Sequence, residues 1–140
     1  MFDRLGIQVL APGPRFAAQT RFWVNGEDLV EQAVGPGGYG PSAVSVFPVG
    51  RPGLLRATGE PRRVELGEPE CTGGCCGFLS AVVQRFGNVV RWSDWEVPAD
   101  GTRPLEFDFE ADRYEAELAR VEAPGWRRRG RARSRLPGRE

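Results

Sequence analysis

Hydrophobic and polar residues alternate in three short stretches of the chain, residues 5–9, 62–66 and 104–109. A period of two places successive side chains on opposite faces of a strand, so each stretch predicts a β-strand with one face toward a core. The inward positions of these strands would be Leu5, Ile7, Val9, Val64, Leu66, Leu105, Phe107 and Phe109.

Residues 78–97 predict a β-hairpin, because Gly87-Asn88 separates two runs rich in β-forming residues. With a two-residue turn, Val82 faces Ser93 and Ser80 faces Trp95. Both faces of this hairpin carry apolar residues, which indicates a central position in a sheet.

Residues 20–30 predict a second hairpin, since Asn25-Gly26 supplies the positive-φ pair of a type I′ turn. Its register pairs Trp23 with Asp28 and Phe22 with Leu29. A competing interpretation begins a short helix at Asp28, because the apolar residues that follow could form one helical face.

Residues 110–123 predict the main helix, in which Ala111, Tyr114, Leu118 and Val121 form one apolar stripe. Arg113 and Glu117 are one turn apart and could pair. Either Asp108 or Asp112 could cap the helix start, and Pro124-Gly125 would end it.

Residues 35–61 contain many glycines and prolines and predict a long irregular loop, with a short ordered insert near residues 44–47. Loops of this length are often functional or mobile. The whole pattern predicts one α+β domain over residues 1–124, with a mainly antiparallel sheet of five to seven short strands and one C-terminal helix. Residues 125–140 have no apolar periodicity and predict a flexible, disordered, Arg-rich tail.

The amino-acid composition excludes several kinds of catalytic and metal site. The chain has 140 residues and no histidine, which excludes Ser-His-Asp and Cys-His catalysis and every zinc site that contains histidine. All basic residues are arginine, as expected for a GC-rich genome. The sequence shows no signal peptide and no long apolar run, and three cysteines favour free thiols in a reducing cytoplasm.

The cysteines lie together in "PECTGGCCGF", residues 69–78, as Cys71, Cys75 and Cys76. They could hold a soft metal such as zinc, and extension of the 78–97 hairpin register offers Asp100 as the carboxylate ligand. They could also form a redox pair across the Gly73-Gly74 turn, or pack as small apolar side chains. The C-x3-C-C spacing differs from paired C-x2-C modules, so the structural interpretation is favoured.

Charge is unevenly distributed, with an acidic stretch over residues 94–122 followed by a basic one. The basic residues of the tail include Arg127, Arg128, Arg129, Arg131 and Arg133. They could contact nucleic acid through phosphates, although no reader module accompanies them, and a solvated tail is the favoured interpretation. "GPGGYG", residues 35–40, matches G-x-G-x-x-G, but Pro36 and Pro41 break the strand and helix that a dinucleotide site requires.

The stretch "WSDW" offers a candidate interface. Strand alternation would place Trp92 and Trp95 on opposite faces, one in the core and the other, if exposed, available to anchor a partner beside Asp94.

Three segments together resemble a group of small uncharacterised bacterial proteins: a GCCG turn, a V-x-W-x-D-W strand and an F-D-x-x-x-Y-x-x-E-L segment. The matching positions are Gly74, Cys75, Cys76, Gly77, Trp92, Asp94, Trp95, Phe107, Asp108, Tyr114, Glu117 and Leu118. The resemblance covers about residues 20–122. It implies that the cysteine turn belongs to the scaffold of a recurrent domain, and it implies no activity.

The sequence therefore predicts a cytoplasmic, non-enzymatic protein that binds another protein, of the toxin-neutralising or accessory kind, without a membrane partner. A small metal or thiol-redox protein and a nucleic-acid-associated protein are the alternatives.

Overall fold

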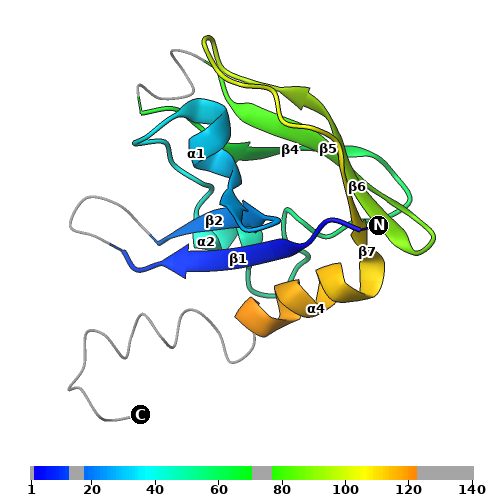
Figure 1. Ribbon diagram of the computed structural model, residues 1–140. Helices are drawn as coiled ribbons and strands as arrows, with labels where there is room; N and C mark the ends of the chain where they lie inside the picture. Colours follow the sequence, from blue (N-terminus) through cyan, green and yellow to red (C-terminus); the bar gives the residue numbers. More distant parts are fainter. Residues whose placement is uncertain (1, 13–17, 71–76, 123–140) are drawn as a thin grey trace, which may run out of the picture.

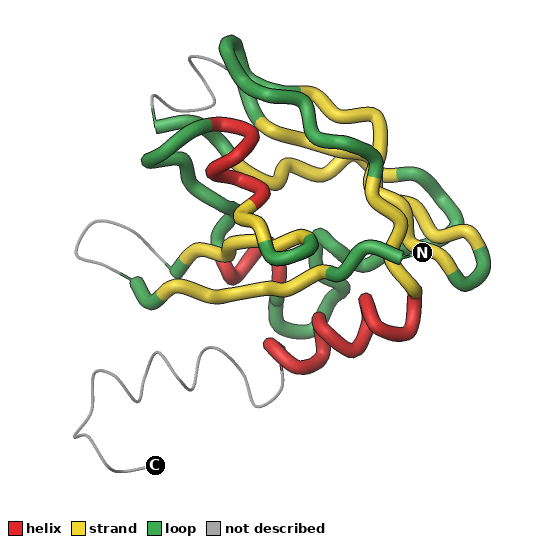
Figure 2. The backbone as a smooth tube through the Cα atoms, in the orientation of Figure 1, coloured by secondary structure: helices red, strands yellow, loops and turns green. Residues whose placement is uncertain are grey.

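The computed structural model describes residues 2–12, 18–70 and 77–122 and contains two antiparallel sheets (Figures 1 and 2). The first sheet has the order β1 (Leu5–Leu10), β2 (Gln19–Val24), β3 (Glu27–Asp28). The second has the order β4 (Arg62–Gly67), β5 (Leu79–Phe86), β6 (Val89–Glu96), β7 (Phe107–Glu110). The helices are α1 (Leu29–Val34), α2 (Ala43–Val46) and α4 (Ala111–Glu122). The α+β fold with a C-terminal helix is confirmed, but the strands divide between two sheets instead of one.

The β5–β6 hairpin is central in its sheet, as predicted, and its register holds from the turn as far as Val82 opposite Ser93. Beyond that pair the ladder shifts, so that Ser80 pairs with Glu96 and not with Trp95. Asp94 causes the shift by adopting a positive φ of 56°, a conformation that aspartate tolerates within a β-bulge.

The N-terminal hairpin and the competing short helix are both present. Asn25 and Gly26 have φ values of 55° and 87°, and Trp23 pairs with Asp28 as predicted. The strand then stops, because the Asp28 side chain accepts a hydrogen bond from the Glu31 N–H at 3.0 Å and caps α1. Leu29 therefore begins a helix, and the predicted Phe22–Leu29 pair is wrong.

The core between the two sheets is built around Trp92, whose side chain is fully buried. Phe22 from the first sheet meets this ring edge-on at 5.9 Å between centroids. Phe109 and Tyr114 meet it at 5.1 and 6.3 Å, so β2, β6, β7 and α4 converge on one indole. Edge-to-face pairs of this kind add to the stabilisation from apolar burial.

Helix α4 buries the predicted stripe, with Ala111, Tyr114 and Val121 inside and Leu118 partly buried. Neither aspartate caps it; Asp108 instead pairs with Arg91 at 2.7 Å. The Ala111 N–H at the helix start donates to the Asn88 carbonyl at 2.8 Å.

Strand β7 begins at Phe107, later than predicted. Leu105 lies outside it and is 79% exposed, so its predicted inward position is wrong. The Trp95 indole N–H donates to the Leu105 carbonyl at 2.8 Å, so this segment contributes its backbone, not its side chain.

Two side chains of α4 bond to the outer edge of β1 at Ile7. The Glu117 carboxylate accepts a hydrogen bond from the Ile7 N–H at 2.8 Å, and the Arg120 guanidinium donates to the Ile7 carbonyl at 2.9 Å. These side chains bond to each other at 2.6 Å, and the predicted Arg113–Glu117 pair is replaced by a pair between Arg113 and Glu110. Ile7 is thus bonded at its outer edge as though another strand lay beside it.

We expect this contact to make stability depend on pH. Partial burial alone would raise the pKa of Glu117, but the hydrogen bonds from Arg120 and Ile7, together with the arginine charge, outweigh it and lower the pKa below 4.5. The unfolded state then binds more protons, so this stabilisation is complete above pH 4.5 and is lost as the pH falls through the lower folded value.

When the pH is lowered from about 5 to 3, the free energy of unfolding measured in urea should accordingly fall less for Glu117→Gln than for the wild type. Glu122→Gln, at an exposed position of the same helix, is the matched control and should retain the wild-type slope. Equal slopes for the wild type and Glu117→Gln would contradict the assignment.

Candidate functional site: a groove along the edge of β4

An open groove with a volume of about 580 Å³ follows the outer edge of β4. One wall is formed by Arg63, Val64 and Glu65 of β4, and the other by Gly40, Pro41 and Ser42. We call this feature the β4 groove and call residues 35–42 the strap. The volume falls within the range of pockets that bind ligands.

The hydrogen-bond pattern shows which backbone groups of β4 face the groove. The two-residue turn closes on the Phe86–Val89 pair, so even-numbered residues of β5 bond to β6 and odd-numbered ones face β4. The hydrogen bond from the Arg85 N–H to the Thr58 carbonyl, at 2.7 Å, is consistent with this alternation, because Thr58 lies just before β4 in the chain.

Val64 lies opposite Ala81 and therefore bonds to β5. The N–H and C=O groups of Arg63 and Glu65 consequently point away from β5, toward the groove. Both residues are exposed, and no other described residue provides a backbone partner for them. An unpaired strand edge of this kind is a template for another extended chain.

The strap shows how such pairing proceeds at the far end of β4. Tyr39 and Glu68 exchange both backbone hydrogen bonds at 2.9 Å, forming an antiparallel bridge. The strap then leaves β4 and crosses to the other sheet, where Ser42 pairs with Gln19. Beyond the bridge, no strand lies beside Arg63 and Glu65 in the described part of the chain, and the groove occupies that position.

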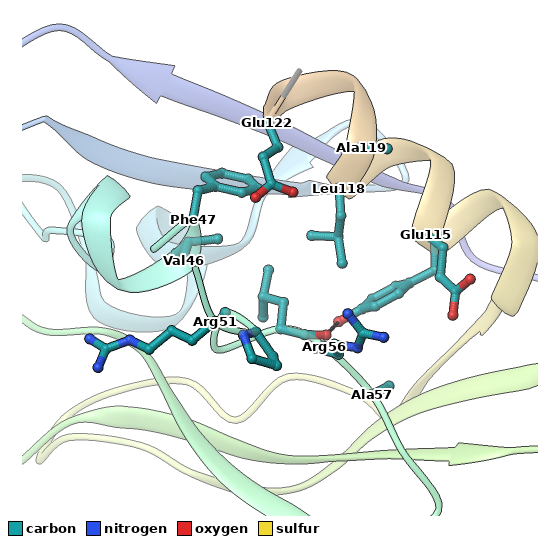
Figure 3. Close-up of a pocket in the computed structure, with 13 residues that line it drawn as sticks. Val46, Phe47, Arg51, Arg56, Ala57, Glu115, Leu118, Ala119 and Glu122 are labelled. Atoms are coloured by element: carbon teal, nitrogen blue, oxygen red, sulfur yellow. Dashed lines mark hydrogen bonds between the residues drawn. The ribbon is translucent and has the colours of Figure 1, made fainter. Parts of the chain in front are cut away.

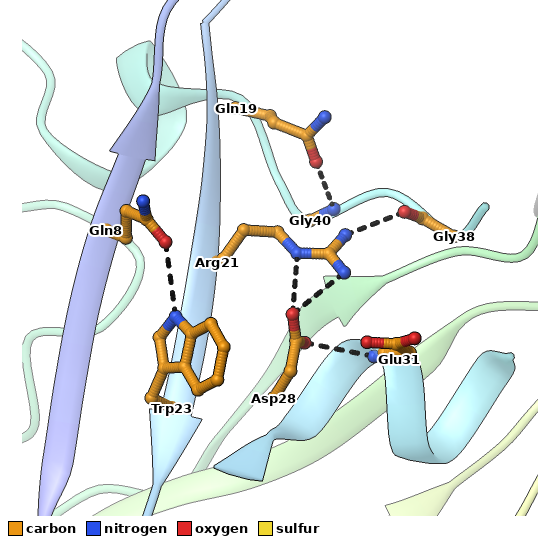
Figure 4. Close-up of polar contacts among 8 residues, drawn as sticks. All are labelled: Gln8, Gln19, Arg21, Trp23, Asp28, Glu31, Gly38 and Gly40. Atoms are coloured by element: carbon orange, nitrogen blue, oxygen red, sulfur yellow. Dashed lines mark hydrogen bonds and ion pairs between the residues drawn. The ribbon is translucent and has the colours of Figure 1, made fainter. Parts of the chain in front are cut away.

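Partly buried polar contacts from β2 hold the strap in place (Figure 4). Arg21 donates to the Gly38 carbonyl at 2.7 Å and contacts the Asp28 carboxylate through two nitrogens at 3.0 and 3.2 Å. The Gln19 side-chain carbonyl accepts from the Gly40 N–H at 2.9 Å. Within the predicted loop of residues 35–61, the part around Gly38 and Gly40 is therefore bonded to β2. Helix α2 matches the predicted ordered insert.

Close packing requires glycine at position 40. A Cβ atom there would overlap the carbonyl oxygen of Thr20. The Thr20 N–H and hydroxyl both donate to the Pro41 carbonyl at 2.8 Å, so strap and β2 are in direct backbone contact. The wall of the groove is thus rigidly placed before any partner arrives.

The charge of the groove is mainly acidic. Among the described residues, the charged side chains that line it are three glutamates, Glu65, Glu68 and Glu96, and one arginine, Arg63. That arginine already contacts the carboxylates of Asp94 and Glu96 at 3.4 and 3.7 Å. A basic segment would therefore be favoured electrostatically over an acidic one.

The predicted metal or redox residues Cys71, Cys75 and Cys76 lie outside the described residues. Asp100 is described: it is exposed, has a φ of 65°, and lies in the turn where the Gly101 N–H donates to the Pro98 carbonyl. The bulge at Asp94 ends the register from which Asp100 was placed opposite Cys75, so that prediction loses its geometric basis. Within the described ranges, no three cysteine, aspartate or glutamate side chains form a potential metal site.

The predicted interface tryptophans are both buried, at 0% exposure for Trp92 and 3% for Trp95. The expectation of opposite faces is wrong, because the bulge at Asp94 turns both rings toward the core, 6.4 Å apart. An interface anchor requires an exposed tryptophan ring, and neither of these two rings is exposed. Asp94 itself is exposed and contacts Arg63 beside the β4 groove.

The tail arginines Arg127, Arg128, Arg129, Arg131 and Arg133 also lie outside the described residues. The "GPGGYG" segment follows helix α1 and precedes Pro41, so it lacks the strand and helix of a dinucleotide site. Its glycines serve the strap instead.

Sequence reasoning did not single out Arg63, Glu65 or Gly40. One signal was present in "RRVEL", where polar residues flank an apolar one in a short strand, as is common at a sheet edge. The distant partner of the strap, Thr20, has no such local signal.

No family model, curated protein or solved structure matches this chain. The resemblance to small bacterial proteins therefore stays a prediction. No described helix is both long and apolar enough to cross a membrane.

Proposed function

We propose that this chain is a cytoplasmic, non-enzymatic interaction protein that binds an extended, basic segment of a partner protein as an added strand along β4. The observation that carries the proposal is the outward-facing backbone of Arg63 and Glu65 beside the preformed groove. Strand addition gains its affinity from main-chain hydrogen bonds and its selectivity from the side chains around them.

The surroundings of the groove support this mode of binding. The opposite wall is fixed by partly buried hydrogen bonds, so little ordering is needed when a segment binds. Phe78, which is 37% exposed, also lines the groove and offers apolar contact to alternate side chains of the added strand.

A blocked hexapeptide of alternating valine and lysine is a suitable probe. We expect saturable binding, measured by NMR titration, with the amide signals of Arg63 and Glu65 shifting and those of Ala81 remaining unchanged. The same peptide with glutamate in place of lysine should bind more weakly because of the acidic groove.

Glu65→Pro tests the backbone contact directly. Proline at this position removes an outward-facing N–H, which edge strands tolerate, and leaves the β4–β5 ladder intact. One hydrogen bond contributes about 0.5–1.5 kcal/mol, so affinity for the lysine peptide should fall by a factor of about 2 to 13. Glu65→Ala keeps the N–H and separates this effect from the loss of charge.

Should Glu65→Pro fail to fold, N-methylation of alternate peptide residues provides the same test on the wild-type chain. Methylation on one set of alternate residues should abolish binding, and methylation on the other should leave it intact. Absence of saturable peptide binding, or equal effects of the two methylation patterns, would refute the proposal.

A further inference from the structure

A second cleft, separate from the β4 groove, lies between α4 and residues 51–57 and has a volume of about 440 Å³ (Figure 3). Its floor is apolar, formed by Val46, Phe47 and Leu55 together with Tyr114. Leu118 points from α4 into the cleft and remains only partly buried. An apolar floor of this size suits a small molecule with a flat or compact hydrophobic body.

The floor and one rim are held in place by hydrogen bonds. Arg62 donates to the carbonyls of Leu54 and Arg56 at 2.9 and 3.0 Å, which fixes the rim segment. The Tyr114 hydroxyl donates to the Leu55 carbonyl at 2.5 Å and accepts from the Trp92 indole at 3.3 Å. The cleft is therefore preformed, which lowers the ordering cost of binding.

The rim of the cleft carries two carboxylates of α4, Glu115 and Glu122, and two arginines, Arg51 and Arg56. On α4, Glu115 is paired with Arg85 at 2.5 Å. Across the cleft, neither Arg51 nor Arg56 has a side-chain partner among the described residues. In Figure 3, Arg51 extends away from the helix, whereas Arg56 lies nearer to α4. Arg56 is thus the cation available to a ligand on this floor.

We propose that this cleft binds a small molecule with an apolar body and one anionic group, the body resting on Leu118, Phe47 and Leu55 and the anion contacting Arg56. Guanidinium groups form strong charge-assisted hydrogen bonds with carboxylates and sulfonates. The apolar floor, together with one unpaired arginine that lies toward α4, favours this ligand class over a polyanion. The inference is independent of the β4 groove.

Two fluorescent probes separate the apolar and anionic contributions. 1-Anilinonaphthalene-8-sulfonate carries the anion, and N-phenyl-1-naphthylamine has the same ring system without it. We expect one-to-one binding of both probes to the full chain. Arg56→Gln should weaken the sulfonate at least about tenfold and change the neutral probe less than about twofold.

Arg51→Gln is the matched control and should leave both affinities within about twofold, since its side chain extends away from α4 although the residue lies at the rim. Leu118→Trp fills the cleft and should abolish binding of both probes, with NMR shifts at α4 lost in parallel. The proposal is overturned if neither probe binds saturably, if Arg56→Gln leaves sulfonate affinity unchanged, or if Arg51→Gln has an equal effect. If Leu118→Trp does not fold, the pair of arginine variants still decides.

Discussion

Trp92→Ala is expected to lower the free energy of unfolding by about 3–5 kcal/mol, the range for truncation of a large buried aromatic residue. The Trp92 indole is 0% exposed and contacts aromatic rings from both sheets and from α4. Its loss leaves a cavity at the point where these elements meet and removes the indole N–H that bonds the Tyr114 hydroxyl. Since small domains are stable by about 5–15 kcal/mol, much of the total would be lost.

Urea unfolding followed by circular dichroism measures this effect, with Trp23→Ala as the control. Trp23 is 38% exposed on the outer side of β2, and its indole N–H donates to the Gln8 side-chain carbonyl at 3.3 Å. We expect this control to cost less than about 1.5 kcal/mol. Similar losses for the two variants would show that Trp92 does not occupy the centre of the core.

Gly40→Ala should produce the second large effect, a loss of about 3 kcal/mol, at the upper end for overpacking of a close contact. The added Cβ would overlap the Thr20 carbonyl, which is backbone and cannot rotate away. The strap must then separate from β2, so its hydrogen bonds to Thr20 and Gln19 are weakened together. Because the strap forms one wall of the β4 groove, affinity for the valine–lysine peptide should fall as well.

Gly59→Ala is the matched control, because it makes the same substitution at a glycine with open space around it. A Cβ atom at position 59 meets no other atom within 4 Å, and the backbone has no positive φ there. Alanine at such a position is neutral or stabilises by about 0.4–1 kcal/mol, because it restricts the unfolded chain. Thermal unfolding of both variants checks the prediction, and a neutral Gly40→Ala would contradict the close packing of the strap.

The elements that the sequence predicted best are those set by local chemistry. The Gly87-Asn88 turn fixes the β5–β6 register, and the apolar stripe of α4 places Tyr114 in the core. The first error in the register arises at Asp94. Unlike Asn25, which lies in an Asn-Gly turn, Asp94 has no local signal for its positive φ, and alternation alone does not reveal the bulge that buries both Trp92 and Trp95.

The β4 groove could not be predicted for a related reason. Its walls come from segments more than twenty residues apart, and the contact that positions the strap is between Gly40 and Thr20. The sequence shows a glycine at position 40, but it does not show that this glycine packs against the backbone of Thr20. The orientation of the backbone at Arg63 and Glu65 likewise depends on pairing with β5 and not on their own residue types.

A protein that accepts a strand at one edge risks being extended at its other edges into a polymer. Here Glu117 and Arg120 occupy the hydrogen-bonding positions of Ile7 on β1, and Asp3 bonds the outer backbone of Asp108 on β7 at 2.8 and 2.9 Å. Contacts within the chain therefore block strand addition at Ile7 and at Asp108. A segment bound along β4 would then find no continuation of the sheet at these two positions, which favours a one-to-one complex over a polymer.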